Sequence, residues 1–99
     1  MNITKKIREL RENKGMSQAE LAKAAGLSTT YISLMESGKK SPTLKSLEKI
    51  STALDIPFPV LSFMSLSEED IPVEKRSAFR LLGPSVNAMI KEFFLKEVS

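Results

Sequence analysis

Apolar residues recur at helical spacing from the beginning of the chain. Ile3, Ile7 and Leu10 stand four and three positions apart, so they fall on one face of a helix. This pattern predicts a helix over residues 2–13. We expect it to end at Gly15, because glycine readily adopts the left-handed conformation that commonly follows a helix.

The residues after this turn predict a second helix. Ser17 is followed three positions later by Glu20, the spacing of a capping box, in which each side chain accepts a hydrogen bond from the other residue's backbone N–H. The helix is expected to run to about Ala25 and to be closed by Gly26. Because the candidate cap of the next helix, Ser28, follows Gly26 by two positions, the turn between the two helices is expected to be tight.

Two further helices have start signals of the same kind. Ser28 is the candidate N-cap of a third helix that extends to residue 37. Ser41-Pro42 followed by Thr43 marks the start of a fourth, with proline just before the cap. The residues of helices two to four that we expect to face the core are Leu21, Ala22, Ile32, Met35, Leu44, Leu47, Ile50, Ser51 and Leu54.

The second half of the chain is less regular. Pro57 and Pro59 forbid a continuous helix there, and Gly83-Pro84 is expected to break another. The predicted elements are a short helix over residues 60–66, a helix over 73–82 and a final helix over 85–97. No strand pattern competes along the chain, so the predicted fold class is all-α.

The final predicted helix has an apolar stripe that is too large to stay exposed. The stripe consists of Val86, Met89, Ile90, Phe93 and Phe94. It packs either on its own bundle or on a second copy of the chain, and we favour a dimer interface because symmetric dimers are common. Residues 1–66 are then the main helical domain, and residues 67–99 are a C-terminal helical extension that serves as a dimerisation element.

Composition excludes several classes of function. The 99 residues contain no Cys and no His, so zinc sites and Ser-His-Asp triads lose their usual members. No run approaches the roughly 20 apolar residues of a membrane span, and the N-terminal residues show helical periodicity instead of a signal peptide. We expect a cytoplasmic protein that is not an enzyme and has no metal, cofactor or membrane contact.

The positive charge is concentrated in the first two thirds of the chain. The net charge is +3, with ten Lys or Arg and six Asp or Glu in residues 1–67, against five and six in residues 68–99. A basic surface on the N-terminal part suits contact with phosphate groups, although a mildly basic solvated surface has the same composition.

The segment from Gln18 to Gly38 carries the strongest functional signal. Two short helices joined by a tight turn at Gly26 are typical of a helix-turn-helix, whose second helix enters the major groove of double-stranded DNA. The side chains that we expect to contact bases are Thr29, Thr30, Ser33 and Leu34. The candidates for phosphate or mixed contacts are Gln18, Ser28, Tyr31, Lys39, Lys40, Ser41, Thr43 and Lys45.

Several motifs between residues 3 and 60 are specific when taken together. They are Ile7-Arg8-Glu9-Leu10-Arg11, Gly15-Met16-Ser17-Gln18, Glu20-Leu21-Ala22, Gly26-Leu27-Ser28, Tyr31-Ile32-Ser33, Glu36-Ser37-Gly38 and the helix after Pro42. In these motifs the chain resembles the Cro/cI-type helix-turn-helix family of phage repressors, also called the XRE family. The resemblance implies a compact, lambda-repressor-like bundle of five helices.

The resemblance also implies roles for individual residues. The position of Gln18 usually contacts DNA in this family, and Arg11 and Glu36 match a pair that forms an internal salt bridge. Family members typically bind palindromic operators as two-fold dimers. Thr, Ser and Leu replace the Gln residues that some phage repressors use to read bases. Beyond residue 60 the chain is similar only to the short helical extensions of small regulators, including restriction–modification controllers and some antitoxins.

Two functional hypotheses follow. The first is a transcriptional regulator, a repressor or autoregulator, that binds a palindromic operator in double-stranded DNA as a homodimer. The alternative is an antitoxin or protein-interaction module that binds a partner protein through its C-terminal helix. The apolar stripe fits both hypotheses equally well.

Overall fold

The computed structural model describes residues 2–95, and every regular element in them is helical. The first five helices are α1 (Ile3–Asn13), α2 (Gln18–Ala25), α3 (Thr29–Glu36), α4 (Leu44–Ala53) and α5 (Phe58–Met64). Two 3₁₀ turns follow, η1 (Glu68–Asp70) and η2 (Val73–Lys75), and then α6 (Arg76–Ile90) and the π-helical segment η3 (Lys91–Leu95). The predicted all-α fold, a five-helix bundle with a helical extension, is confirmed.

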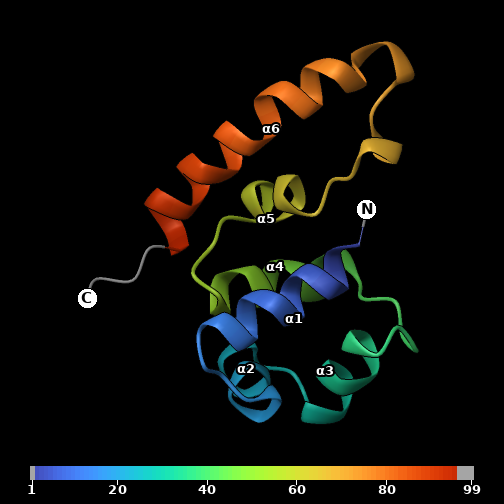
Figure 1. Cartoon of the computed structure of the whole chain (residues 1–99). Helices are drawn as coiled ribbons and strands as arrows, with labels where there is room; N and C mark the ends of the chain where they lie inside the picture. Colours follow the sequence, from blue (N-terminus) through green and yellow to red (C-terminus); the bar gives the residue numbers. More distant parts are fainter. Residues whose placement is uncertain (1, 96–99) are drawn as a thin grey trace.

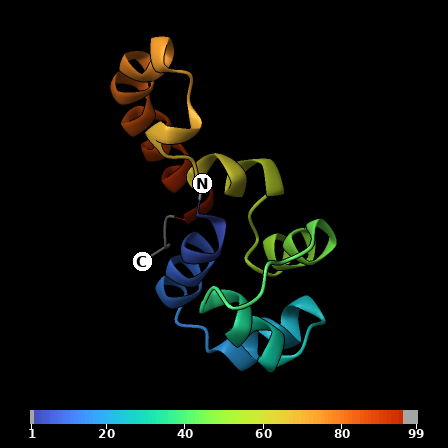
Figure 2. The same cartoon turned by 90° about the vertical axis from the view of Figure 1, so that its right-hand side faces the viewer.

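The helices α2 and α3 lie at one end of the molecule and α6 lies at the other (Figure 1). Helices α1, α4 and α5 occupy the space between them, and the view turned by 90° shows the same order (Figure 2). None of the helices in residues 2–95 is long and apolar enough to cross a membrane.

One apolar core holds the five-helix bundle together. It consists of the buried residues Ile7, Leu10, Leu21, Ala22, Ala25, Ile32, Met35, Ile50, Leu54, Ile56 and Leu61. Each fully buried aliphatic side chain contributes about 1.5–3 kcal/mol relative to an exposed one. The expectation that Leu44 faces the core is wrong, because this first residue of α4 is 59% exposed, and Leu47 is only half-buried.

The helix starts follow the capping signals in the sequence. The hydroxyl of Ser17 accepts the N–H of Glu20, whose carboxylate accepts the N–H of Ser17, so the predicted capping box is present. Ser28 caps α3 and Thr43 caps α4 in the same manner, each through its side-chain oxygen. These caps fix where the helices of the bundle begin.

The predicted helix break at Gly83-Pro84 is wrong, because α6 is continuous from Arg76 to Ile90 with Pro84 inside it. A residue before proline normally avoids the helical conformation because its backbone N–H and its Cβ collide with the proline ring. Gly83 has no Cβ, so part of this collision is absent, and the helix continues through Pro84. The last two residues of the predicted final helix lie outside the described residues.

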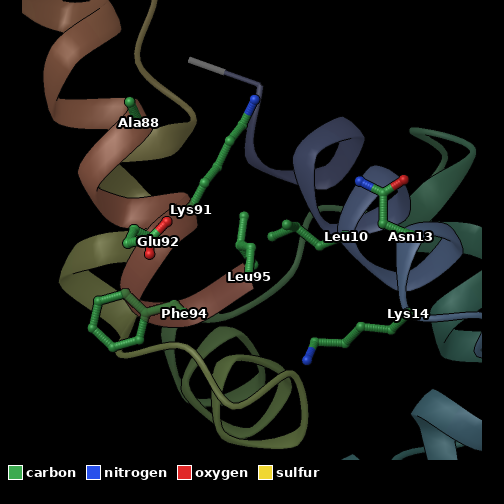
Figure 3. Close-up of a pocket in the computed structure, with 8 residues that line it drawn as sticks. All are labelled: Leu10, Asn13, Lys14, Ala88, Lys91, Glu92, Phe94 and Leu95. Atoms are coloured by element: carbon green, nitrogen blue, oxygen red, sulfur yellow. The ribbon is translucent and has the colours of Figure 1, made fainter. Parts of the chain in front are cut away.

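The end of α6 joins the extension to the bundle. Leu95 of η3 packs against the core and points toward Leu10 of α1 (Figure 3). An open groove of about 680 Å³ lies around this contact, with Lys14 on the α1 side and Lys91 and Phe94 on the other. Apart from this region, α6 packs mainly against its own flanking turns.

Candidate nucleic-acid interface

The start of α3 presents short polar side chains to solvent. Thr29, Thr30 and Ser33 are exposed, and Leu34 is half-buried. On the opposite side of the helix, Ile32 and Met35 are fully buried in the core. Because the exposed side chains are small, the backbone of α3 can approach the edges of base pairs closely.

The turn between α2 and α3 has the geometry of a helix-turn-helix. Gly26 adopts a left-handed conformation with φ 67° and ψ 33°, which a glycine reaches at little cost. Its N–H bonds to the carbonyl oxygens of Ala22 and Lys23 and so ends α2. The chain then enters α3 after only two residues, Leu27 and Ser28.

The loop after α3 carries exposed cations. Lys39 and Lys40 follow the end of α3 after two residues, Ser37 and Gly38, and Lys45 lies in the first turn of α4; all three lysines are exposed. Ser41 in the same loop is also exposed. The hydroxyls of Ser28 and Thr43, which were also predicted to contact phosphates, already serve as helix caps.

Tyr31 connects α3 to this loop. The half-buried side chain accepts a hydrogen bond from the N–H of Thr43 at 3.3 Å, and the Nζ of Lys40 lies 5.3 Å from the centre of its ring. Burial raises the pKa of Tyr31, but hydrogen bonds from Ser46 and Thr43 and the charge of Lys40 outweigh it and lower the pKa overall. Tyr31 therefore helps to fix the position of the basic loop.

Arg11 of α1 and Glu36, the last residue of α3, form a buried ion pair. Arg11 Nε lies 2.8 Å from Glu36 Oε2, and Nη2 lies 3.0 Å from Oε1. The side chains are 10% and 2% exposed, and Arg11 Nη1 also donates to the carbonyl oxygen of Met16 at 2.7 Å. The hydrogen bonds that Arg11 donates to Glu36 raise the pKa of Arg11, and burial opposes this only in part.

The side chain of Gln18 also contacts Glu36, and the sequence did not predict this contact. Gln18 Nε2 donates to Glu36 Oε1 at 3.1 Å. The sequence suggested only an outward contact for Gln18, because a hydrogen bond between α2 and the end of α3 depends on how the two helices cross. The crossing of the helices brings Arg11, Gln18 and Glu36 together.

The predicted dimer-interface residues divide between two sides of α6. Ile90 is buried within the chain and cannot contribute an exposed surface, which corrects its place in the predicted interface. Val86 is half-buried, and Phe94 is 37% exposed. Met89 and Phe93 are exposed, and the continuous helix adds Leu81 and Leu82, which sequence reasoning missed. We call the exposed set of Leu81, Leu82, Met89 and Phe93 the outer apolar face.

The structure also limits the chemistry of the described part of the chain. Between residues 2 and 95, no group of three or more acidic side chains could hold a metal ion. Two surfaces of the described residues stand out by their exposed side chains: the polar start of α3 with its basic loop, and the outer apolar face.

Comparison with known proteins gives consistent matches. The helix-turn-helix family HTH_3 matches residues 7–61. The ImmF control region 10 kDa protein of Bacillus phage phi105 is 35% identical over 60 residues, which cover 61% of this chain and 67% of that protein. The chain spans smaller shares, 29% and 59%, of two curated transcriptional regulators that it also matches.

Two solved structures resemble the chain. The restriction–modification controller protein C.AhdI from Aeromonas hydrophila is 38% identical with a TM-score of 0.58, over 61% of this chain and 91% of that one. A chain of the SinR protein/SinI protein complex is 32% identical with a TM-score of 0.59, over 79% of this chain and 75% of that chain.

Proposed function

Because the chain belongs to the XRE-type helix-turn-helix family of DNA-binding transcriptional regulators, we propose that it binds a two-fold symmetric operator as a homodimer. The observation that carries this proposal is the exposed start of α3, where Thr29, Thr30 and Ser33 face solvent over a fully buried opposite side. In helix-turn-helix proteins this end of the second helix contacts base edges in the major groove.

The polar groups on α3 suit a particular kind of recognition. The hydroxyls of Thr30 and Ser33 can donate to or accept from base edges, and the methyl group of threonine can pack on the methyl group of thymine. The four predicted base-contact positions include no Arg, Lys, Asn or Gln, the side chains that make bidentate contacts with bases. Much of the specificity must then come from the sequence-dependent shape of the DNA.

The basic loop supplies the contacts that hold the protein on the duplex. Lys39, Lys40 and Lys45 are exposed beside α3, where their charges can neutralise phosphates of the two strands. These contacts set the register and the salt dependence of binding but carry no base sequence.

The outer apolar face supports the homodimer. Leu81 is 77% exposed, Phe93 71% and Met89 57%, an unusual apolar surface for a chain of this size. Residues 81–90 are ten consecutive positions without a charged side chain. A second copy of the same helix can therefore approach the part of this face formed by Leu81, Leu82 and Met89 without meeting a charge from residues 81–90, whereas Lys91 and Glu92 lie between Met89 and Phe93.

The test is selection of bound duplexes from a random DNA pool, followed by titration of the best sequence over a range of salt concentrations. Recovery of a palindrome with half-sites about one helical turn apart is expected. The variant with Thr30→Ala and Ser33→Ala should lose discrimination between this sequence and a scrambled one. Lys39→Ala should weaken binding to both and reduce the salt slope by about one unit. Unselective binding by the unaltered chain would contradict the proposal.

A second candidate function is the binding of a different protein through the outer apolar face. The solved structure of SinR is a complex with a second protein, SinI, and the matched part of that chain is 32% identical to this one. Sedimentation of the purified chain separates the two functions. A monomer at micromolar concentration would favour a heterologous partner, and a dimer favours the operator-binding homodimer.

A further inference from the structure

Glu36 accepts hydrogen bonds both from Arg11, the buried arginine of α1, and from Gln18, the first residue of α2. Its Oε1 accepts from Arg11 Nη2 at 3.0 Å and from Gln18 Nε2 at 3.1 Å. Its Oε2 accepts from Arg11 Nε at 2.8 Å. Because the side chain is only 2% exposed, these bonds take the place of its hydration.

The carboxylate determines which way the amide of Gln18 points. A carboxylate accepts hydrogen bonds and cannot donate them, so the NH₂ group of Gln18 must face Glu36 and the amide oxygen must turn away. One N–H of the amide then remains for an external acceptor. The reversed amide would place two acceptor oxygens against each other.

The charge of Arg11 neutralises the carboxylate of Glu36, so a DNA phosphate can approach Gln18 without repulsion. An isolated carboxylate behind the start of α2 would repel a phosphate group that approached Gln18. The guanidinium of Arg11 pairs with both oxygens of Glu36, so the two charges cancel where they lie. The third polar contact, from Arg11 Nη1 to the carbonyl oxygen of Met16, holds the guanidinium in place at 2.7 Å.

We infer that Glu36 is a positioning residue for DNA binding, which orients the Gln18 amide so that its free N–H donates to a phosphate oxygen of the operator. Glutamine loses much rotational freedom when it is immobilised, so an amide that is already fixed loses less on binding. This inference rests on the proposed DNA-binding function. It adds a role to Glu36, whose family resemblance implies only a structural salt bridge.

The test is a double-mutant cycle in the full chain that combines Gln18→Ala with Glu36→Gln, using the duplex recovered by selection as the probe. Gln18→Ala should weaken binding about tenfold, the effect of losing a hydrogen bond to a charged group. Glu36→Gln should weaken binding about threefold, because the amide can then adopt either orientation. In the Gln18→Ala background, Glu36→Gln should have no further effect on affinity.

Unfolding in urea separates this role from a purely structural one. Glu36→Gln should lower stability both with and without Gln18→Ala, since most of that loss comes from Arg11 and only a smaller, coupled part comes from the hydrogen bond of Gln18. If Glu36→Gln folds poorly, Arg11→Met combined with Glu36→Met removes both charges together, a replacement that buried ion pairs often tolerate. The combined variant should show the same affinity loss and the same dependence on Gln18.

A second readout needs no DNA. In the free protein, the Gln18 amide proton that faces Glu36 should resonate away from its position in a solvated glutamine, and Glu36→Gln should return it toward that position. Equal affinity losses from Glu36→Gln in both backgrounds, or no loss in either, would overturn the positioning role. No binding of any duplex by the unaltered chain would instead overturn the proposed function, and the inference with it.

Discussion

At the scale of single residues, the ion pairs of the chain differ sharply in what they contribute. Arg11 and Glu36 are 10% and 2% exposed, whereas Lys6 and Glu9 form a pair at 3.0 Å whose side chains are 30% and 46% exposed. A buried pair holds its charges away from water, so the loss of one partner leaves the other without compensation. An exposed partner is simply rehydrated.

We therefore expect Arg11→Met to destabilise the fold by about 3–5 kcal/mol, the usual effect of leaving a buried charge unpaired. Lys6→Met is the matched control and should cost about 0–1 kcal/mol. Urea unfolding of the two variants measures both values. Similar losses in the two would show that the Arg11–Glu36 pair is in effective contact with water.

The same scale shows which parts of the site the sequence could predict. The exposed positions of Thr29, Thr30 and Ser33 follow from the helical period once Ile32 and Met35 are placed in the core. The contact between Gln18 and Glu36 does not, because it joins residues 18 positions apart and depends on the angle at which α2 and α3 cross. No local pattern encodes that angle.

At the scale of secondary-structure elements, the start of α2 depends on a charged cap. The carboxylate of Glu20 accepts the N–H of Ser17 at 2.9 Å. This backbone hydrogen bond, supported by the hydroxyl of Ser17, lowers the pKa of Glu20. Its contribution to stability is therefore fully present above the unfolded pKa of about 4.3 and is lost as the pH falls through the lower folded pKa.

Glu20→Gln should remove this part of the pH dependence, since the amide oxygen still accepts the N–H of Ser17 but does not titrate. The expected result is a smaller difference between the urea midpoints at pH 7 and pH 3 than in the unaltered chain. Glu20→Ala serves as the control, because it removes the acceptor at both pH values. An unchanged difference in Glu20→Gln would contradict the assignment of this cap.

The continuity of α6 depends on the pairing of glycine with proline. An added Cβ at Gly83 would meet no atom within 4 Å outside its own stretch of helix, so packing leaves room for alanine. The cost of a side chain there comes from the ring of Pro84, which disfavours the helical conformation for any preceding residue that has a Cβ. We therefore expect the absence of a Cβ at Gly83 to favour the continuity of α6.

A second cycle tests this explanation. Gly83→Ala in the Pro84→Ala background should stabilise α6 by about 1 kcal/mol, the usual gain of alanine over glycine in a helix. In the presence of Pro84 the same change should give no gain or a loss. Exchange of the backbone amides of α6 with deuterium measures the difference. Equal gains in both backgrounds would refute this role of Gly83.

Some features of the helices could be predicted from the sequence and others could not. The starts of α2, α3 and α4 were predictable because Ser17, Ser28 and Thr43 cap their helices locally. The break at Gly83-Pro84 was predicted wrongly, because each residue alone disfavours a helix and only their order removes part of the collision. The exposure of Leu44 was missed, because a helical period alone does not show where the core ends.

At the scale of the whole molecule, the two proposed functional surfaces lie far apart. The start of α3 is at one end and α6 at the other, so an interface on the outer apolar face leaves both copies of α3 uncovered (Figures 1 and 2). The junction between the two parts consists largely of η3, where Leu95 packs against the bundle core. The spacing of two recognition helices in a dimer would therefore depend on this junction.

The role of the outer apolar face in dimerisation can be tested by placing a single charge either on this face or on another side of α6. Met89→Glu introduces a carboxylate at a position that is 57% exposed in the single chain and would be buried between two copies. In the proposed two-fold dimer, two such charges would enter the interface, each without a partner. Burial of an unpaired charge costs about 3–5 kcal/mol, so dimer affinity should fall by on the order of a hundredfold or more.

Asn87→Glu is the matched control, since residues two positions apart point to different sides of a helix and Asn87 is already polar and exposed. It adds the same charge and should leave dimerisation intact. Sedimentation at micromolar concentration and titration of the full palindrome against a single half-site give the two readouts. Met89→Glu should lose the preference for the full palindrome while keeping its half-site affinity, because α3 is unaltered. If both variants remained dimeric, the two copies would have to meet through another surface.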